Sequence, residues 1–201
     1  MKNFKQLAIT AIVLVIGLYG RAQKIELTEG SLADLRTEKS IDLSFTYDSM
    51  TMGGKGHPQE SEYVAKKTAE YNKKTPGKGD EWAKTWKDDR EALYQPAFSK
   101  IFQQMSGLEL NAKAKYTLIF KTIYLEPGFN IMIHSEPSQI NGVAWIVESA
   151  NKAHVLAKLS VTKARGRNYW GNDFDSGQRL SEAYEAAGSQ LGYYIKKNAS
   201  N

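Results

Sequence analysis

The sequence predicts an α/β (α+β) fold in which helices pack on a single mixed β-sheet. Three observations support this prediction: strand patterns group in the middle of the chain, helical patterns come before and after them, and no linker is long enough to divide two domains. Helices layered on a sheet are one of the few arrangements that bury the apolar surfaces of both. We therefore expect residues 23–201 to form one α/β domain.

Residues 1–22 have the three-part pattern of a secretory signal peptide. Lys2 and Lys5 give a positive start, residues 7–19 form an uncharged and mostly apolar run, and Gly20 and Ala22 place small residues at positions −3 and −1 of a cleavage site. A bilayer-spanning helix would need about 20 apolar residues, which is more than this run provides. We expect cleavage after Ala22 and no transmembrane segment afterwards.

The composition excludes several function classes. The chain has no cysteine, which removes disulfides, thiolate catalysis, cysteine-ligated zinc and lipid attachment at a signal-peptide cysteine. Loss of Lys2, Lys5 and Arg21 with the signal peptide would lower the net charge from +5 to +2. A nucleic-acid partner is not expected, because a nucleic-acid-binding domain is normally strongly basic.

The first elements follow from local patterns. After a short polar lead, residues 40–48 alternate apolar and polar side chains, which is typical of a half-buried strand. Residues 50–59 hold three glycines and a proline and are predicted to be a loop. Residues 60–74 place Tyr63 and Tyr71 at helical spacing, with charges on the remaining faces.

A second helical stretch is interrupted by a proline. Residues 75–80 break the first helix, and a longer helical pattern starts at Asp80. Proline within a helix removes a hydrogen bond and clashes with the preceding turn, at a cost of about 3 kcal/mol. We expect a break or kink near Gln95 and a further helix with Pro96 in its first turn.

The central part of the chain is predicted to be mostly strand. Residues 115–125 have apolar side chains on both faces, as in a strand covered on both sides. Residues 126–128 turn the chain into a second strand over residues 129–134. Two further strands are joined by a tight turn at residues 149–152. In this pair we expect Val143, Trp145 and Val147 to face Val155, Ala157, Leu159 and Val161.

Residues 177–197 are predicted to form the last helix. Apolar residues recur at steps of three and four, at Leu180, Tyr184, Ala187, Leu191 and Ile195. A second set is small: Ala183, Ala186, Ala187, Gly188 and Gly192. Glycine within a helix costs roughly 1 kcal/mol relative to alanine, so such a small-residue face indicates close packing against a sheet.

The loop 165–175 is the candidate binding surface. It combines arginines, aromatic residues and carboxylates, and its candidate binding residues are Arg165, Arg167, Tyr169, Trp170, Asp173 and Asp175. Aromatic faces flanked by hydrogen-bonding groups suit sugars and peptides, and arginine with tyrosine and tryptophan is typical of interface hot spots. The alternative is that Tyr169, Trp170 and Phe174 fold over the end of the sheet as part of the core.

The DFDSG motif starting at Asp173 resembles the beginning of a calcium loop, but its register fails. The required glycine would be at position 6 and arrives at position 5, as Gly177, and position 12 is Tyr184 instead of glutamate. Asp175 followed by Gln178 three residues later instead predicts a capping box, and the alternative is a local cation site at the two aspartates. Asp173 would add negative charge near the positive end of the helix dipole.

No catalytic set can be assembled from the sequence. The three histidines, His57, His134 and His154, lie apart, and a structural role is expected for each. Neither a G-x-S-x-G nucleophile motif nor a G-x-x-x-x-G-K-[ST] phosphate loop is present, and no cofactor or metal is predicted. The enzymatic alternative is a metal-assisted hydrolase that uses Asp173 and Asp175 with a histidine brought in from elsewhere.

The segments LEPGFNIMIHSEPSQINGVAWIVES, HVLAKLSVTKARGR and DFDSGQRLSEAYEAAGSQLGYYIKK carry a resemblance over residues 115–197. They resemble a group of uncharacterised exported bacterial envelope proteins. More distantly, they are similar to periplasmic α/β domains of outer-membrane lipoproteins involved in assembly or secretion. The resemblance implies an α/β envelope domain and brings no catalytic residue. The absent lipidation cysteine departs from the lipoprotein pattern and leaves outer-membrane tethering open.

The sequence as a whole predicts an exported, non-enzymatic envelope protein. We expect it in the periplasm, with peripheral association to the outer membrane left open, and we expect a protein or cell-wall glycan partner at residues 165–175. The sequence leaves the oligomeric state undecided.

Overall fold

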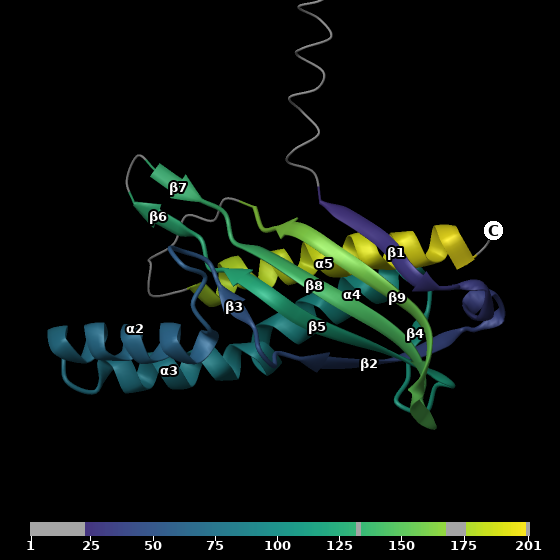
Figure 1. Ribbon diagram of the computed structural model, residues 1–201, viewed down its shortest axis with the longest axis horizontal. Helices are drawn as coiled ribbons and strands as arrows, with labels where there is room; N and C mark the ends of the chain where they lie inside the picture. The colour runs from purple at the N-terminus through teal and green to yellow at the C-terminus, as the bar shows by residue number, and fades with distance from the viewer. Residues whose placement is uncertain (1–22, 132–133, 168–175, 200–201) are drawn as a thin grey trace, which may run out of the picture.

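A mixed β-sheet forms the centre of the molecule, and helices cover one of its faces (Figure 1). The computed structural model describes residues 23–131, 134–167 and 176–199. The strands are β1 (Lys24–Gly30), β2 (Ser40–Thr46), β3 (Thr51–Met52), β4 (Glu109–Leu110), β5 (Tyr116–Glu126), β6 (Phe129–Ile131), β7 (His134–Glu136), β8 (Gln139–Glu148) and β9 (Asn151–Arg165). The helical elements are the 3-10 turn η1 (Ala33–Thr37), α2 (Glu60–Lys74), α3 (Lys78–Asp89), the π-helical segment η2 (Arg90–Tyr94), α4 (Gln95–Ser106) and α5 (Ser176–Ala199). The predicted α+β class is confirmed.

The sheet has the strand order β1-β9-β8-β5-β2-β4, and β3 pairs with β5. Strands β5, β8, β9 and β1 are antiparallel neighbours, whereas β2 runs parallel to β5 and β4 runs parallel to β2. The hairpin between β8 and β9 turns at Ser149 and Ala150, within the predicted turn. The β6–β7 hairpin forms a separate two-stranded sheet. Within the described ranges, no helix is both long and apolar enough to span a membrane.

The helix-facing side of the sheet forms the core together with α4 and α5. Across β8 and β9, Ala144 lies opposite Leu159 and Ile146 lies opposite Ala157, and all four side chains are fully buried. Tyr184 of α5 closes this core, because its hydroxyl group bonds to that of Thr122 at 2.7 Å. Helices α4 and α5 thereby cover β5, β8 and β9 from one side (Figure 1).

The small-residue face of α5 lies against α4. A Cβ atom at Gly188 would lie 2.5 Å from the carbonyl oxygen of Phe98, and one at Gly192 would lie 2.8 Å from the carbonyl oxygen of Phe102. Real Cβ atoms do not approach backbone oxygen so closely, so these two positions need glycine for close helix packing. The small-residue face was predicted to pack closely against the sheet; its close packing is confirmed, but at these two glycines the partner is the backbone of α4 and not the sheet.

Pro96 is accommodated without a loop. Helix α3 passes into η2, where the hydrogen-bond pattern is π-helical, and the chain returns to α-helix at Gln95 with Pro96 in the first turn of α4. A π-helical segment inserts an extra residue into the helix, so the side chains after it are rotated around the helix axis. The irregular hydrogen bonds of this segment lie next to Pro96, which has no backbone N–H to donate. The predicted irregularity near Gln95 is therefore a local change of helix type.

The predicted facing is confirmed for Val147, which lies opposite Val155, and for the buried set Ala157, Leu159 and Val161, but it is wrong for Val143 and Trp145. Val143 and Trp145 lie on the face away from the helices, opposite Ser160 and Lys158. Val155 is 43% exposed instead of buried. Both alternating sets of side chains in β8 are largely apolar, so the period-2 pattern could not identify its inner face, whereas β9 alternates apolar and polar residues from Ala157 to Thr162.

Two further expectations need correction. Residues 24–30, which looked like a polar lead, form the edge strand β1, paired with β9 through an irregular register. Strand β5 was predicted to be covered on both sides, but Ile123 is 39% exposed. Among the described helices, α4 and α5 pack on the side of β5 that carries Phe120.

We expect the substitution Gly188→Ala to destabilise the protein. Alanine is the better helix former by roughly 1 kcal/mol, but its methyl group would meet the backbone of Phe98, and overpacking of this kind costs about 1–3 kcal/mol. Chemical denaturation followed by circular dichroism measures the change in the free energy of unfolding. Gln190→Ala is the control, because Gln190 is exposed on the same helix. A Gly188→Ala variant more stable than wild type would contradict the close packing of α4 and α5.

Candidate functional site

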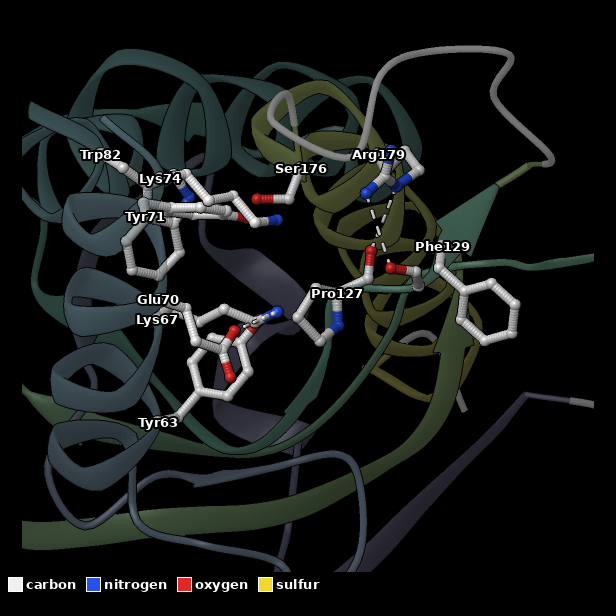
Figure 2. Close-up of a pocket in the computed structure, with 11 residues that line it drawn as sticks. Tyr63, Lys67, Glu70, Tyr71, Lys74, Trp82, Pro127, Phe129, Ser176 and Arg179 are labelled. Carbon is white, nitrogen blue, oxygen red and sulfur yellow. Dashed lines mark hydrogen bonds and ion pairs between the residues drawn. The ribbon is translucent and has the colours of Figure 1, made fainter. Parts of the chain in front are cut away.

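A cavity of about 270 Å³ opens between the α2–α3 hairpin, the turn from β5 to β6 and the start of α5 (Figure 2). Helix α2 supplies one wall with side chains spaced three and four residues apart, which places them on one face of the helix. These side chains are Tyr63, Lys67, Glu70, Tyr71 and Lys74. A single amphipathic face of α2 therefore provides both the aromatic surface and the positive charges of the cavity.

The aromatic wall is held by the hairpin itself. Trp82 of α3 packs on Tyr71 at 5.5 Å and on Tyr63 at 6.2 Å between ring centroids. Helix α3 can approach α2 closely because its first turn contains Gly79, whose N–H donates to Oδ1 of Asn72 at 2.7 Å. The rings are thus fixed by packing within the hairpin and are preorganised for contact with a ligand.

The two lysines of α2 differ in their surroundings. The Lys67 ammonium group pairs with Glu70 at 3.4 Å and lies 5.8 Å from the centroid of the Tyr71 ring. Lys74 extends across the cavity toward the side where Ser176 lies (Figure 2). Within the described part of the chain, no carboxylate lies within 4 Å of the Lys74 ammonium group. The cavity therefore presents a net positive charge to a ligand.

Arg179 fixes the opposite wall. Its side chain is buried, and its guanidinium group donates to the carbonyl oxygens of Pro127 at 3.3 Å and Gly128 at 3.5 Å (Figure 2). The carbonyl oxygen of Arg179 in turn accepts a hydrogen bond from the hydroxyl group of Ser138. Gly128 has a φ of 68°, a left-handed conformation that favours glycine. Arg179 thus ties the β5–β6 turn to α5.

Burial controls the titration of two groups near the cavity. Burial, reinforced by nearby Tyr71 and Glu126, raises the pKa of Tyr63 well above its ordinary value, so its phenol stays protonated and can donate a hydrogen bond. Burial also raises the pKa of Glu126, and the charge of Glu136 adds to this effect. The N–H of Gly128, which donates to Glu126 at 3.1 Å, and His57 act in the opposite direction.

The predicted binding loop is described only at its start. Arg165 is half-buried, and its Nε donates to Oε1 of Gln139 at 2.9 Å. Arg167 is exposed and pairs with Glu185 of α5 at 3.3 Å. The other candidates, Tyr169, Trp170, Asp173 and Asp175, lie outside the described residues. Arg165 and Arg167 therefore do not line the cavity.

The histidines do not meet in a common site within the described residues. His57 lies in the loop before α2 and contacts the ring of Tyr124 at 5.8 Å. His154 is exposed on β9 and lies 3.3 Å from Glu148. His134 is in β7. In the described ranges, no three His, Cys, Asp or Glu side chains are grouped so that they could hold a metal ion.

The described part of α5 starts at Ser176, so the predicted capping box at Asp175 stays a prediction. The capping carboxylate itself lies outside the described residues. The hydrolase hypothesis, which depends on Asp173 and Asp175, stays a prediction for the same reason.

No local sequence pattern predicts the cavity. The helical spacing of Tyr63 and Tyr71 predicts a packing stripe, and both residues do pack in or against the core, but Lys67 lies on the same face of α2. The missed signal was the lysine within an aromatic stripe, because a core-facing stripe normally excludes charge. The side chains of α2 meet Pro127 and Ser176 only through the tertiary structure, so no local sequence pattern indicates that these residues share a cavity.

Comparison with known proteins identifies no family. No protein-family model matches the chain, and no curated protein matches its sequence. Among solved structures, the chain is similar to the PelC dodecamer from Paraburkholderia phytofirmans, with 11% identity and a TM-score of 0.43, over 87% of this chain and 98% of that chain. A methionine variant of the same dodecamer gives 12% identity and a TM-score of 0.41, with the same coverage. These similarities are too low to assign a function.

We expect Glu126→Gln to stabilise the protein at neutral pH. Because the folded-state pKa of Glu126 is raised, its contribution to stability is present below its ordinary pKa near 4.5 and is lost as the pH rises through the folded-state value. Glutamine removes the charge but keeps an oxygen to accept the N–H of Gly128. Melting temperatures from pH 3.5 to 8 should show a gain at pH 7 that disappears at acidic pH.

The control for this prediction is Glu62→Gln, which removes an exposed carboxylate on α2. It should give no gain at pH 7. A constant difference between Glu126→Gln and wild type across the whole pH range would show that titration of Glu126 is not the cause.

Proposed function

We propose that the protein is an exported binding protein of the cell envelope, and that the cavity beside α2 binds an acidic glycan. The signal-peptide pattern of residues 1–22 supports export. The observation that carries the ligand class is the combination of an aromatic wall with the ammonium groups of Lys67 and Lys74 in one cavity. Aromatic faces pack against the C–H faces of sugar rings, and lysine attracts a carboxylate or sulfate group.

The size of the cavity limits what enters it. Small-molecule pockets typically measure about 300–1,000 Å³, and this cavity, at about 270 Å³, is at the lower end of that range. It suits one acidic sugar unit of a longer chain, which leaves the rest of the glycan on the surface. Tyr63, whose phenol stays protonated, is a suitable donor to a sugar hydroxyl or ring oxygen.

The loop 165–175 remains part of the proposal as a second contact for the same glycan. Ser176, which directly follows this loop, lines the cavity. Arg165 bonds to Gln139 of β8, and Arg167 pairs with Glu185 of α5.

We expect the purified protein to bind trigalacturonic acid more tightly than the neutral tri-N-acetylglucosamine. Intrinsic tryptophan fluorescence can report binding, because Trp82 lines the cavity. Lys74→Gln should weaken binding of the acidic trisaccharide about tenfold, which corresponds to about 1.4 kcal/mol, and added salt should weaken binding in wild type because the attraction is partly exposed to solvent.

The matched control is Lys73→Gln, which removes the neighbouring exposed charge that does not line the cavity. Equal losses in Lys73→Gln and Lys74→Gln would indicate a general charge effect. Equal affinity for the neutral and the acidic trisaccharide would contradict the proposed ligand class, and no binding of either one would contradict the glycan-binding function of this cavity.

A further inference from the structure

Strand β2 has a free outer edge beyond the end of β4. Strand β4 pairs with Ser40 and Ile41, whereas on its other side β2 pairs with β5 from Asp42 to Thr46. The chain leaves this edge after Asn111, whose N–H donates to the carbonyl oxygen of Ile41 at 3.0 Å. Among the described strands, none pairs with the outer edge of β2 after Ile41.

The register identifies the backbone groups along this edge. The carbonyl oxygens of Lys39 and Ile41 point toward β4, since they accept from Glu109 and Asn111. Successive residues of a strand direct their backbone groups to opposite sides, so the N–H and C=O groups of Leu43 and Phe45 also point outward. Five residues of strand span about 16 Å, which is enough for a short added strand.

A groove of about 570 Å³ runs along this edge, between β2 and the start of α4. Leu43 and Phe45 are half-buried there, and Phe45 is supported from inside by Phe98 at 5.3 Å between ring centroids. Pro96 and Leu110 add apolar surface. The groove thus combines unpaired backbone groups with apolar contacts for alternate side chains, as sites of strand addition do.

The charges of the groove are all of one sign. Asp42 and Glu91 line it, and no lysine, arginine or histidine is among the described residues that do so. Asp42 accepts a hydrogen bond from Thr117 at 3.2 Å, which holds its carboxylate at the edge. An extended segment with basic side chains is the complementary occupant.

The two edges of the sheet, β1 and β2, differ in how well they are protected from pairing with another strand. The β1 edge carries an ion pair between Lys24 and Glu26 and an irregular register, and the N–H of Leu27 donates to the hydroxyl group of Tyr194. Charged side chains, irregularities and capped backbone groups are the devices that protect edge strands from pairing. From Leu43 to Phe45, β2 has neither lysine, proline nor a register shift.

We propose that an extended segment of a partner protein, with basic residues at alternate positions, adds to the sheet as a strand beside β2 in line with β4. This inference is independent of the glycan-binding proposal, because the groove and the cavity share no lining residue among those described. Leu43 and Phe45 provide the backbone hydrogen bonds, while Asp42 and Glu91 select the charge of the partner.

The probe for this proposal is a fluorescein-labelled octapeptide of alternating valine and lysine, measured by fluorescence anisotropy with the purified protein. Saturable binding is expected, at least tenfold tighter than that of the valine–glutamate counterpart. Methylation of the backbone nitrogens at every second residue removes donors from one edge of the peptide only. One methylated register should abolish binding and the other should retain it, because only one edge pairs with β2.

The matched variants are Leu43→Pro and Leu43→Ala. Both variants remove most of the leucine side chain, but only proline also removes the N–H that points outward. An edge strand tolerates proline at a position where the missing N–H would face outward. Leu43→Pro should bind the valine–lysine peptide about fivefold more weakly than Leu43→Ala, because one backbone hydrogen bond is lost. Circular dichroism establishes that both variants fold; the methylated peptides test wild type directly and do not depend on them.

Three results would overturn the proposal. They are equal binding of both methylated registers, equal binding of the lysine and glutamate peptides, and absence of saturable binding. Sedimentation analysis adds a fourth outcome: self-association of wild type that Leu43→Pro abolishes would assign the edge to a second copy of this chain instead of a basic partner segment.

Discussion

The close contact between α4 and α5 positions both the core and one wall of the candidate cavity. Because glycine at positions 188 and 192 lets the two backbones meet, α5 lies deep enough for Tyr184 to reach Thr122 on β5 and to stack on Tyr94 at 5.0 Å between ring centroids. Little more than one turn before Tyr184, Arg179 holds the turn that forms one wall of the cavity. A change in the separation of these helices would therefore move the cavity wall as well as the core.

The opposite wall of the cavity depends on a half-buried ion pair. Arg90 of η2 pairs with Glu60 at the start of α2 and lies 4.3 Å from the centroid of the Tyr47 ring. The indole N–H of Trp86 donates to the same carboxylate at 2.7 Å. Loss of one partner would leave the other charge partly buried and unpaired, which usually costs far more than the pair contributes. The π-helical segment thus anchors the α2–α3 hairpin that carries the aromatic wall.

Local patterns in the sequence predicted the helices and most strands, because helical spacing and strand alternation survive in residues 60–74, 115–125 and 177–197. They failed where both faces of a strand are apolar, as at Val143 and Trp145, and where an edge strand is mostly polar, as in β1. The candidate sites are harder to predict for a physical reason. The cavity combines side chains that α2, the β5–β6 turn and α5 bring together, and the edge of β2 is exposed only because β4 is short.

The net charge of +2 that residues 23–201 carry conceals two surfaces of opposite sign. The cavity carries Lys67, Lys74 and Arg179 against Glu70, whereas the groove beside β2 carries Asp42 and Glu91. Summed over the chain, these charges nearly cancel. The composition therefore gives no reason to expect one highly charged partner, but it leaves room for two partners of opposite charge that bind at separate sites. Salt screens each site separately, over about 10 Å at 0.1 M. The two proposed ligands, an acidic glycan and a basic protein segment, would therefore not compete, because each surface attracts one of them and repels the other.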